Sequence, residues 1–303
     1  MRVPDVRAED RWPVSAWCRT GGGSGGAGRR GPGNGRGAPR RAWRQALNRD
    51  WLGPMRKHPS ARTDPWPAGP MVPRPWLMEQ SWSEAVILHW RLPVRVAAEH
   101  MPPGTVPEVF DGSSWVGLIG FRMSGTRLGT VLPLPYLGSF TEVNLRLYSR
   151  AADGSRGIVF LSLDAPRLPV VLAARAAGIP YVWSRCRPTS AGRPAPVYGY
   201  EVARRGRQPG TCFAVRPELT AQADDPLSLH LTARYGAHIG FAGRTYFLPV
   251  SHRPWPLHPA ELVHIEDGLM GAAGLAVAGP PESVLFSPGV RVVVGRPWSV
   301  PAP

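Results

Sequence analysis

Residues 140–148, FTEVNLRLY, alternate strictly between two classes of side chain. The odd positions carry threonine, valine and leucine, whereas the even positions carry a carboxylate, an amide and a guanidinium group between two aromatic rings. Successive residues of a β-strand point to opposite faces of the sheet, so this pattern predicts a strand with one apolar and one polar face. The polar face, with Glu142, Asn144 and Arg146, is either a solvated surface or the wall of a wet pocket.

Strand-like segments dominate the chain from Trp76 onward, and short turn-like links join many of them. Such links favour an antiparallel, curved or closed sheet. Three helices are expected, over 93–99, 168–177 and 225–235, and the last starts at Asp225-Pro226, a capping carboxylate before a proline. The fold class is therefore α+β, mostly β, with a few short helices. The ten predicted strands are 84–91, 114–123, 140–148, 157–163, 181–186, 197–202, 211–215, 245–250, 261–266 and 290–294.

Composition and charge divide the chain at about residue 75. Residues 1–75 hold 15 of the 36 basic side chains but only five of the 21 acidic ones, and 19–44 is rich in Gly, Pro and Arg. Such a segment cannot bury enough apolar surface to offset its ordering entropy, so residues 1–75 are expected to be a disordered tail. The alternatives are an arm that contacts nucleic-acid phosphates, or upstream sequence with Met71 or Met78 as the true start. Residues 76–298 are expected to form a single domain.

Cysteine usage and hydropathy favour a cytoplasmic protein. Cys18, Cys186 and Cys212 have no paired spacing, which suggests neither a disulfide framework nor a metal-binding knuckle. The N-terminus has no apolar stretch typical of a secretory signal, and the longest apolar run, 269–281, is too short to span a bilayer. We therefore expect no contact with a membrane. The sequence is compatible with a homo-oligomer.

Six motifs follow one another between residues 78 and 261. They are MEQSWSEAVILHW (78–90), FDGSSWVGLIGFRM (110–123), FLSLDA (160–165), AARAAGIPY (173–181), LTARY (231–235) and HRPWPLHPAE (252–261). Together they resemble the YqjF-like family (DUF2071) of the acetoacetate decarboxylase-like superfamily. This resemblance covers about residues 76–296 and implies a curved antiparallel sheet or barrel around an internal cavity. It also implies that the polar face of 140–148 lines that cavity.

The resemblance to acetoacetate decarboxylases does not extend to their reactive amine. Those enzymes form an imine between a keto acid and a lysine whose pKa is lowered by a second lysine, both in a Gly-hydrophobic-Pro-Lys-Lys segment. The matching segment here is GIPYV, so Tyr181 and Val182 stand at the two lysine positions, and no lysine follows Lys57. A substrate-binding arginine of the family is matched by Ser83, whereas the cavity glutamate is kept as Glu142. Schiff-base decarboxylation is therefore not expected.

A ligand-binding site is expected on the polar face of 140–148. Glu142 could transfer a proton, Asn144 could hydrogen-bond, and Arg146 could hold a carboxylate through two parallel hydrogen bonds. Glu142 and Arg146 lie about 14 Å apart along an extended strand, which is too far for a direct ion pair. If a reaction occurs, Glu142 and Tyr181 are the catalytic candidates, with Tyr181 as a hydrogen-bond donor to the ligand. The side chains expected as further walls of the site are Trp90, Trp115 and His252.

Other chemistry finds little support in the sequence. The eight histidines form neither an HExxH motif nor a tight HxH pair, and the glycine runs of the tail follow no strand. We therefore expect no metal and no cofactor. Asp164 and Arg175 are expected to form a structural ion pair between a strand and the helix that follows it.

The leading hypothesis is a protein that binds a small polar or carboxylated metabolite in the cavity, with or without a reaction. The alternative is a nucleic-acid-associated protein that acts through the basic arm of residues 1–75. A third hypothesis is a structural or partner-binding domain with a dry core, which requires a sealed interior around Glu142.

Overall fold

A computed structural model of the protein describes residues 69, 71–129, 132–191, 196–206 and 210–301. Most of the tail expected over residues 1–75 lies outside these described residues. Its disorder and its boundary with the 76–298 domain therefore stay predictions. No helix in the described part of the chain is long and apolar enough to cross a membrane.

The described residues form fourteen strands and four helices. The helices are α2 (Val94–Ala98), α3 (Leu168–Ala176), α4 (Pro226–Thr232) and α5 (Leu269–Ala272). The strands are β1 (Met78–Leu92), β2 (Thr105–Pro107), β3 (Ser114–Leu128), β4 (Leu132–Pro133), β5 (Phe140–Ala151), β6 (Arg156–Ala165), β7 (Tyr181–Ala191), β8 (Val197–Arg204), β9 (Thr211–Pro217), β10 (Gly236–Phe241), β11 (Arg244–His252), β12 (His258–Glu266), β13 (Ser283–Val294) and β14 (Trp298–Ser299).

The three predicted helices are present as α2, α3 and α4. Asp225 caps α4, because one of its carboxylate oxygens accepts hydrogen bonds from the backbone N–H groups of Leu227 and Ser228, each at 3.0 Å. This helix ends at Thr232, earlier than predicted, because the chain then turns and Arg234 donates its Nε–H to the carbonyl of His230 at 2.6 Å. The sequence pattern therefore locates the start of α4 better than its end.

The ten predicted strands are also present, and most are longer than predicted. β1 begins at Met78 because a bulge between Ser83 and Val86 bends the strand without ending it. The strands β2, β4 and β14 were not predicted because each spans only two or three residues. The unpredicted β10 reads GAHIGF, in which two glycines weaken the strand signal.

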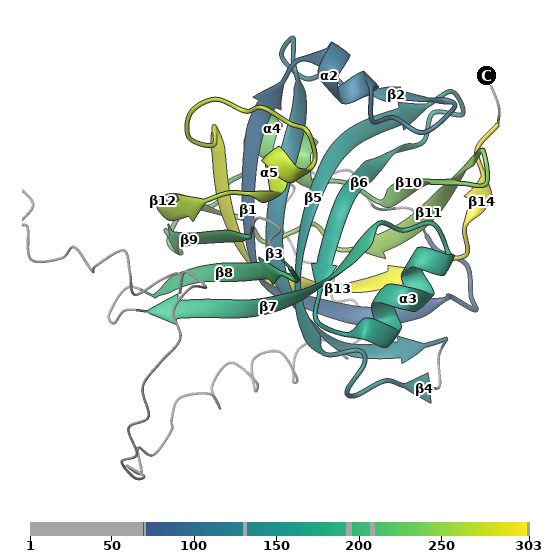
Figure 1. The fold of residues 1–303 in the computed structure, drawn as a ribbon, viewed down its shortest axis with the longest axis horizontal. Helices are drawn as coiled ribbons and strands as arrows, with labels where there is room; N and C mark the ends of the chain where they lie inside the picture. Colours follow the sequence, from purple (N-terminus) through teal and green to yellow (C-terminus); the bar gives the residue numbers. More distant parts are fainter. Residues whose placement is uncertain (1–68, 70, 130–131, 192–195, 207–209, 302–303) are drawn as a thin grey trace, which may run out of the picture. The chain divides into compact units, whose positions relative to one another are not determined.

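Strand pairing closes the sheet into two rings that share one wall (Figure 1). The shared wall consists of β13, β1, β3, β5 and β6. β10 and β11 complete the smaller ring by pairing with β6 and β13, and β7, β8, β9 and β12 complete the larger ring. Most pairings are antiparallel as predicted, but β6 pairs in parallel with both β7 and β10, so the curved sheet is mixed.

The two rings enclose interiors of different character. Residues of the shared wall that face the larger ring, such as Leu88, Leu118 and Leu145, pack with residues of β8, β9 and α5 in a continuous apolar core. On the opposite face of the wall, Trp115 and Tyr148 pack toward residues of β10 and α4. Because side chains alternate along each strand, successive residues of β5 belong to different interiors.

A buried ion pair ties three strands of the larger ring together. Both oxygens of Asp164 in β6 accept hydrogen bonds from Arg204 in β8, at 2.8 and 2.9 Å, and Ser184 in β7 donates to the same carboxylate at 2.5 Å. The pairing of Asp164 with Arg175 that the sequence suggested is wrong, since Arg175 is exposed on α3. The pairing of β6, β7 and β8 brings Arg204 to Asp164, although the two residues are distant in the sequence.

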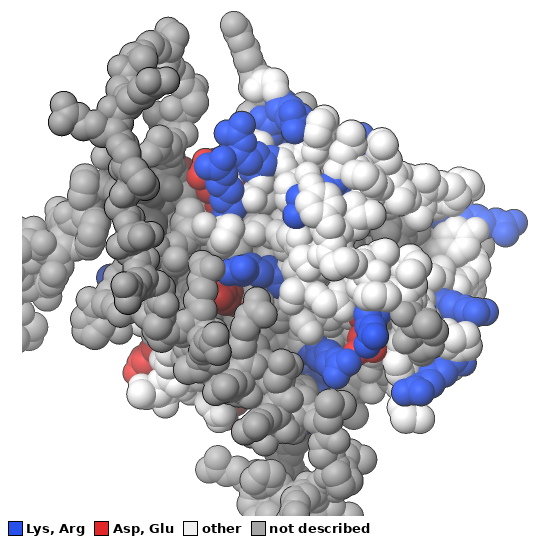
Figure 2. All heavy atoms as spheres, turned by 90° about the horizontal axis from the view of Figure 1, so that it is seen from below, with Lys and Arg blue, Asp and Glu red and all other residues white. Residues whose placement is uncertain are grey.

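Charged side chains at the surface of the folded part occur in separate groups. Figure 2 shows arginines spread over one face, several of them beside an acidic side chain. Among the ion pairs of the described residues, Arg91 contacts Asp111 at 2.7 Å and Glu282 at 2.8 Å. On the face shown, the described residues therefore form no continuous basic stripe.

We expect Asp164→Asn to lower the free energy of unfolding by about 3–5 kcal/mol, because it leaves the buried Arg204 guanidinium without its carboxylate. Arg175→Met, which removes an exposed arginine, should change the same quantity by less than about 0.5 kcal/mol. Urea denaturation of both variants measures the difference. Equal stabilities would contradict the role assigned to the Asp164–Arg204 pair.

Candidate functional site

The even-numbered face of β5 lies inside the smaller ring. Glu142 is 3% exposed, Asn144 2% and Tyr148 0%, so the polar face predicted for this strand is not a solvated surface. Arg146 is partly buried on the same face. The strand thus carries four polar side chains at alternate positions into one interior.

Tyr181 meets Glu142 at one end of this row. Tyr181 opens β7, which pairs in parallel with β6 so that Tyr181 lies beside Leu163, and Leu163 in turn lies beside Asn144. The Tyr181 hydroxyl donates a hydrogen bond to Glu142 at 2.7 Å, and the amide of Asn144 makes a longer contact to the other carboxylate oxygen at 3.4 Å. Two of the predicted site residues, from strands far apart in the sequence, are therefore brought into direct contact.

Burial governs the protonation of this pair. It raises the pKa of Glu142 to about 7, although the hydrogen bonds from Tyr181 and Asn144 favour the ionised form. The pKa of Tyr181 is raised well above its ordinary value, first by burial and then by the neighbouring carboxylate. Glu142 can therefore gain or lose a proton near neutral pH while Tyr181 stays protonated, which suits a general acid or base next to a hydrogen-bond donor.

Arg146 and Asn144 have polar atoms without partners among the described residues. The Nε atom of Arg146 and the Oδ1 atom of Asn144 are buried and make no hydrogen bond there. The positive charge of Arg146 lies close enough to lower the pKa of His89 and of His252, although burial contributes more to both shifts. As predicted from the strand geometry, Arg146 forms no ion pair with Glu142 within the described part of the chain. The Nε–H of its guanidinium group is thus a buried donor without an acceptor among the described residues.

His89 and Tyr148 form a second hydrogen-bonded pair at the other end of the row. His89 in β1 lies two strands away from β5, and its Nε2 atom is 2.6 Å from the Tyr148 hydroxyl. Between them lies Gly117 of β3, and a Cβ atom there would come within 3.0 Å of the His89 ring. The absence of a side chain at Gly117 therefore allows the contact across β3. The glycine inside a predicted strand was the sequence signal for such a close approach.

α4 brings further polar groups against Tyr148 that the sequence did not connect with the site. The ring centroid of His230 lies 6.2 Å from that of Tyr148, and the Arg234 guanidinium lies 5.1 Å from it. Arg234 is paired with Glu108, whereas the Nε2 atom of His230 is buried without a partner among the described residues. Burial lowers the pKa of His230 to about 4, so this side chain is neutral at physiological pH.

The three predicted wall residues are placed differently. Trp115 is fully buried beside Tyr148, and its indole N–H donates to the carbonyl of Phe110 at 3.3 Å. His252 lies near Arg146, but both of its ring nitrogens face backbone carbonyls, at 2.7 and 3.2 Å. Trp90 lies on the other face of β1, in the apolar interior of the larger ring, so it does not share an interior with Glu142. Strand register decides which residues of β1 share a face with Glu142 of β5. Local sequence does not reveal this register.

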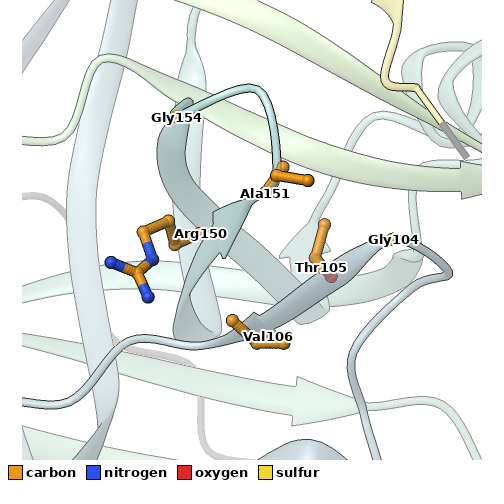
Figure 3. A pocket seen from close by; sticks show the side chains of 7 residues that line it. Gly104, Thr105, Val106, Arg150, Ala151 and Gly154 are labelled. Carbon is orange, nitrogen blue, oxygen red and sulfur yellow. The ribbon is translucent and has the colours of Figure 1, made fainter. Parts of the chain in front are cut away.

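No cluster of three or more His, Cys, Asp or Glu side chains with the spacing of a metal site occurs among the described residues. A surface hollow of about 570 Å³ lies where β2 meets the end of β5 (Figure 3). Its lining includes Thr105, Val106 and Arg150 but none of the predicted site residues. A second hollow, of about 310 Å³, includes Phe160, the β6 neighbour of Arg146, and Pro180, which precedes Tyr181.

Comparison with known proteins gives a family and a fold. The model of the DUF2071 family, described as an uncharacterized conserved protein, matches residues 79–291. The uncharacterized protein YqjF of Bacillus subtilis (strain 168) is 28% identical over 214 residues, which cover 69% of this chain and 85% of YqjF.

Solved structures with a similar fold include acetoacetate decarboxylase from Legionella pneumophila, with a TM-score of 0.53 and 13% identity, covering 81% of this chain and 93% of that one. The enduracididine biosynthesis enzyme MppR with HEPES buffer bound has a TM-score of 0.51 and 17% identity, covering 76% and 88%. MppR complexed with pyruvate has a TM-score of 0.50 and 16% identity, covering 77% and 92%. At these identities the likeness establishes the acetoacetate decarboxylase-like fold alone.

The raised pKa of Glu142 makes stability depend on pH. The unfolded chain binds this proton with the ordinary pKa of 4.5, whereas the folded chain binds it up to about pH 7. The contribution of Glu142 to the free energy of unfolding is thus fully present below about pH 4.5 and is lost as the pH rises through 7, by about 3 kcal/mol in total. Glu142→Gln should remove this decline, so that the variant is more stable than the wild type above pH 7.

Chemical denaturation from about pH 5 to pH 8 measures this effect. Glu218→Gln, which changes an exposed glutamate, serves as the control and should keep the pH dependence of the wild type. Parallel stability curves for the wild type and Glu142→Gln would refute the raised pKa.

Proposed function

We propose that this protein, which belongs to the DUF2071 family and has the acetoacetate decarboxylase-like fold, binds a small carboxylated metabolite inside the smaller ring. The site would lie on the even-numbered face of β5, with Glu142, Asn144 and Arg146 facing the ligand and Tyr181 beside them. The partner is thus a small molecule rather than a macromolecule. MppR, one of the proteins with a similar fold, has been solved in complex with pyruvate, a small carboxylate.

The observation that carries this proposal is the Arg146 guanidinium group. Its Nε–H is buried and has no acceptor among the described residues. A buried donor that carries a charge costs several kcal/mol unless it is paired, and carboxylates match the planar geometry of guanidinium. A carboxylate ligand at this position would supply the missing acceptor and the compensating negative charge.

Glu142 and Tyr181 give the site a reactive end. With a pKa of about 7, the Glu142 carboxyl group can donate or accept a proton, and Tyr181 can stabilise the ionised form through its 2.7 Å hydrogen bond. If the bound metabolite reacts, proton transfer by Glu142 is the step that these residues support. Imine chemistry has no amine to start from here, because the sequence holds no lysine after Lys57.

The hollow of about 310 Å³ is the proposed approach to the site. It lies where β6 separates from β10 and turns to pair with β7, and its lining includes the neighbours of Arg146 and Tyr181 described above. Phe160 lines this hollow and also packs against the apolar groups that contain Tyr181 and Tyr148, so a change of its rotamer is the rearrangement that this approach requires.

Arg146→Met tests the carboxylate site directly. We expect this variant to fold and to be at least as stable as the wild type, because the substitution removes a buried donor that has no acceptor among the described residues and leaves no ionic partner there unpaired. Its affinity for small carboxylates should fall by at least about tenfold, the worth of a hydrogen bond to a charged group. Isothermal titration calorimetry with pyruvate, lactate and succinate, in a buffer without carboxylates, measures the loss.

Arg150→Met is the matched control for this experiment. Arg150 belongs to the same strand but lines the 570 Å³ surface hollow instead of the smaller ring. If carboxylates bind to the wild type and to Arg146→Met equally well, but not to Arg150→Met, the ligand site lies in the surface hollow and the proposal is wrong.

The alternative function rests on the charge of the N-terminal segment. Residues 1–75 carry 15 basic and five acidic side chains, a composition suited to binding nucleic-acid phosphates. If this segment acts in that way, a chain that starts at Met71 should lose binding to single-stranded DNA, and binding by the full chain should weaken steeply with salt. Fluorescence anisotropy at several salt concentrations measures both effects, and equal binding by the two chains would exclude a role for the segment.

A further inference from the structure

Unpartnered polar atoms concentrate around the interior of the smaller ring. The described residues contain ten buried side-chain nitrogen or oxygen atoms without a hydrogen-bond partner. Native proteins satisfy most such atoms, so a local concentration of them marks a place where a bound molecule supplies the missing partners. At least half of the ten lie around this one interior, including those on Asn144, Arg146, His89, His230 and Ser283.

Two of these residues are direct neighbours. Ser283 of β13 lies opposite His89 of β1 in the antiparallel pair, so the two side chains point to the same face with Cβ atoms about 5 Å apart. Ser283 is 8% exposed and His89 0%, and both the Ser283 hydroxyl and the His89 Nδ1 atom lack partners among the described residues. A neutral hydroxyl and a ring nitrogen are thus held side by side, enclosed and unsatisfied.

Tyr148 decides which His89 nitrogen carries the proton. If Nε2 carried it, the Tyr148 hydroxyl would accept that hydrogen bond, and its own proton would have no acceptor among the described residues. If Tyr148 donates to Nε2 over the observed 2.6 Å, the imidazole proton sits on Nδ1 and only one group stays unsatisfied. His89 is neutral because burial and the charge of Arg146 lower its pKa well below the ordinary value. The second arrangement therefore makes Nδ1–H a donor that finds no acceptor among the described residues.

We infer that Ser283 and His89 form a second binding subsite, a pair of neutral donors for an uncharged acceptor oxygen of the ligand. Tyr148 acts as a positioning residue, because it holds the His89 proton on Nδ1. His89 and Ser283 would contact the ligand itself. This inference rests on the proposed function, because the carboxylate end of the same ligand would be held by Arg146.

The position of the subsite defines a class of ligand. Ser283, His89, Gly117 and Arg146 form one row across neighbouring strands of the shared wall. At about 4.8 Å per strand, the backbones of His89 and Arg146 are about 10 Å apart, and only Gly117 lies between them. A ligand that spans the row has a carboxylate at one end and a carbonyl-type oxygen several bonds away, as in the half-amides of dicarboxylic acids.

Heteronuclear NMR of the histidine side chains in labelled full-length protein tests the role of Tyr148 without a ligand. In the wild type, His89 should show a protonated Nδ1 and an unprotonated Nε2. Tyr148→Phe, which removes one oxygen atom, should give a mixture of the two neutral forms while the protein stays folded. A wild-type His89 protonated on Nε2 would overturn the donor pair.

Matched ligands test the subsite itself. Succinamate has a carboxylate and an amide carbonyl, and 4-methylpentanoate has nearly the same shape without the acceptor oxygen. We expect Ser283→Ala and His89→Gln to weaken succinamate relative to 4-methylpentanoate by about threefold to tenfold each, the effect of losing one neutral hydrogen bond. His89→Asn keeps an amide near the Nδ1 position and should retain more of the preference than His89→Gln does.

Ser114→Ala is the control, because Ser114 also has a buried hydroxyl without a partner among the described residues, but it lies opposite Leu92 on the other face of the wall. In Ser114→Ala, the ratio of the affinity for succinamate to the affinity for 4-methylpentanoate should equal that of the wild type. If both probes bind, lose affinity in Arg146→Met and keep their ratio in Ser283→Ala and His89→Gln, the subsite is wrong while the proposed function stands. If neither probe binds to the wild type, the result counts against the proposed function, and the NMR measurement still decides whether His89 offers a donor.

Discussion

The enclosure of one wall of strands on both of its faces is the constraint on which the rest of the structure depends. β1, β3, β5, β6 and β13 belong to both rings, so neither face of these strands is an ordinary outer surface. Alternation along each strand then assigns the buried residues of the wall to one of two interiors, whereas the ends of β3 and β5 reach the surface. A shift of one residue in register would exchange the contents of the two rings, which makes the register of this wall strongly specified.

The two interiors contribute differently: the larger ring mainly stabilises the fold, and the smaller ring holds the polar groups of the candidate site. The larger ring holds a continuous apolar core, fixed at its edge by the Asp164–Arg204 pair, and this burial is the main favourable contribution to folding. The smaller ring contains a carboxyl group that resists ionisation and several donors and acceptors that have no partner within the described part of the chain. Each such group disfavours folding by about 1–3 kcal/mol. The protein tolerates this cost on one face of a wall whose opposite face is well packed.

Local sequence was sufficient for some of these features and not for others. The alternation of 140–148 predicted a strand with a polar face, and the replacement of two lysines by Tyr181 and Val182 was visible in the motif itself. Lateral neighbours were not predictable, because they depend on register between strands that are distant in the chain. Asp164 therefore received the wrong partner, Trp90 was assigned to the wrong interior, and the adjacency of Ser283 and His89 went unnoticed.

The irregularity in β6 has a consequence for comparing this chain with distant relatives. Leu145 and Arg146 are consecutive in β5, but their partners Ser162 and Phe160 are not, so Leu161 is an extra residue in β6. Positions before and after Leu161 therefore follow opposite parities, and an alignment gap placed one residue away would exchange inward and outward positions for the rest of the strand. Homologous site residues can be transferred along β5 by counting, whereas on β6 they must be transferred by superposing the backbones.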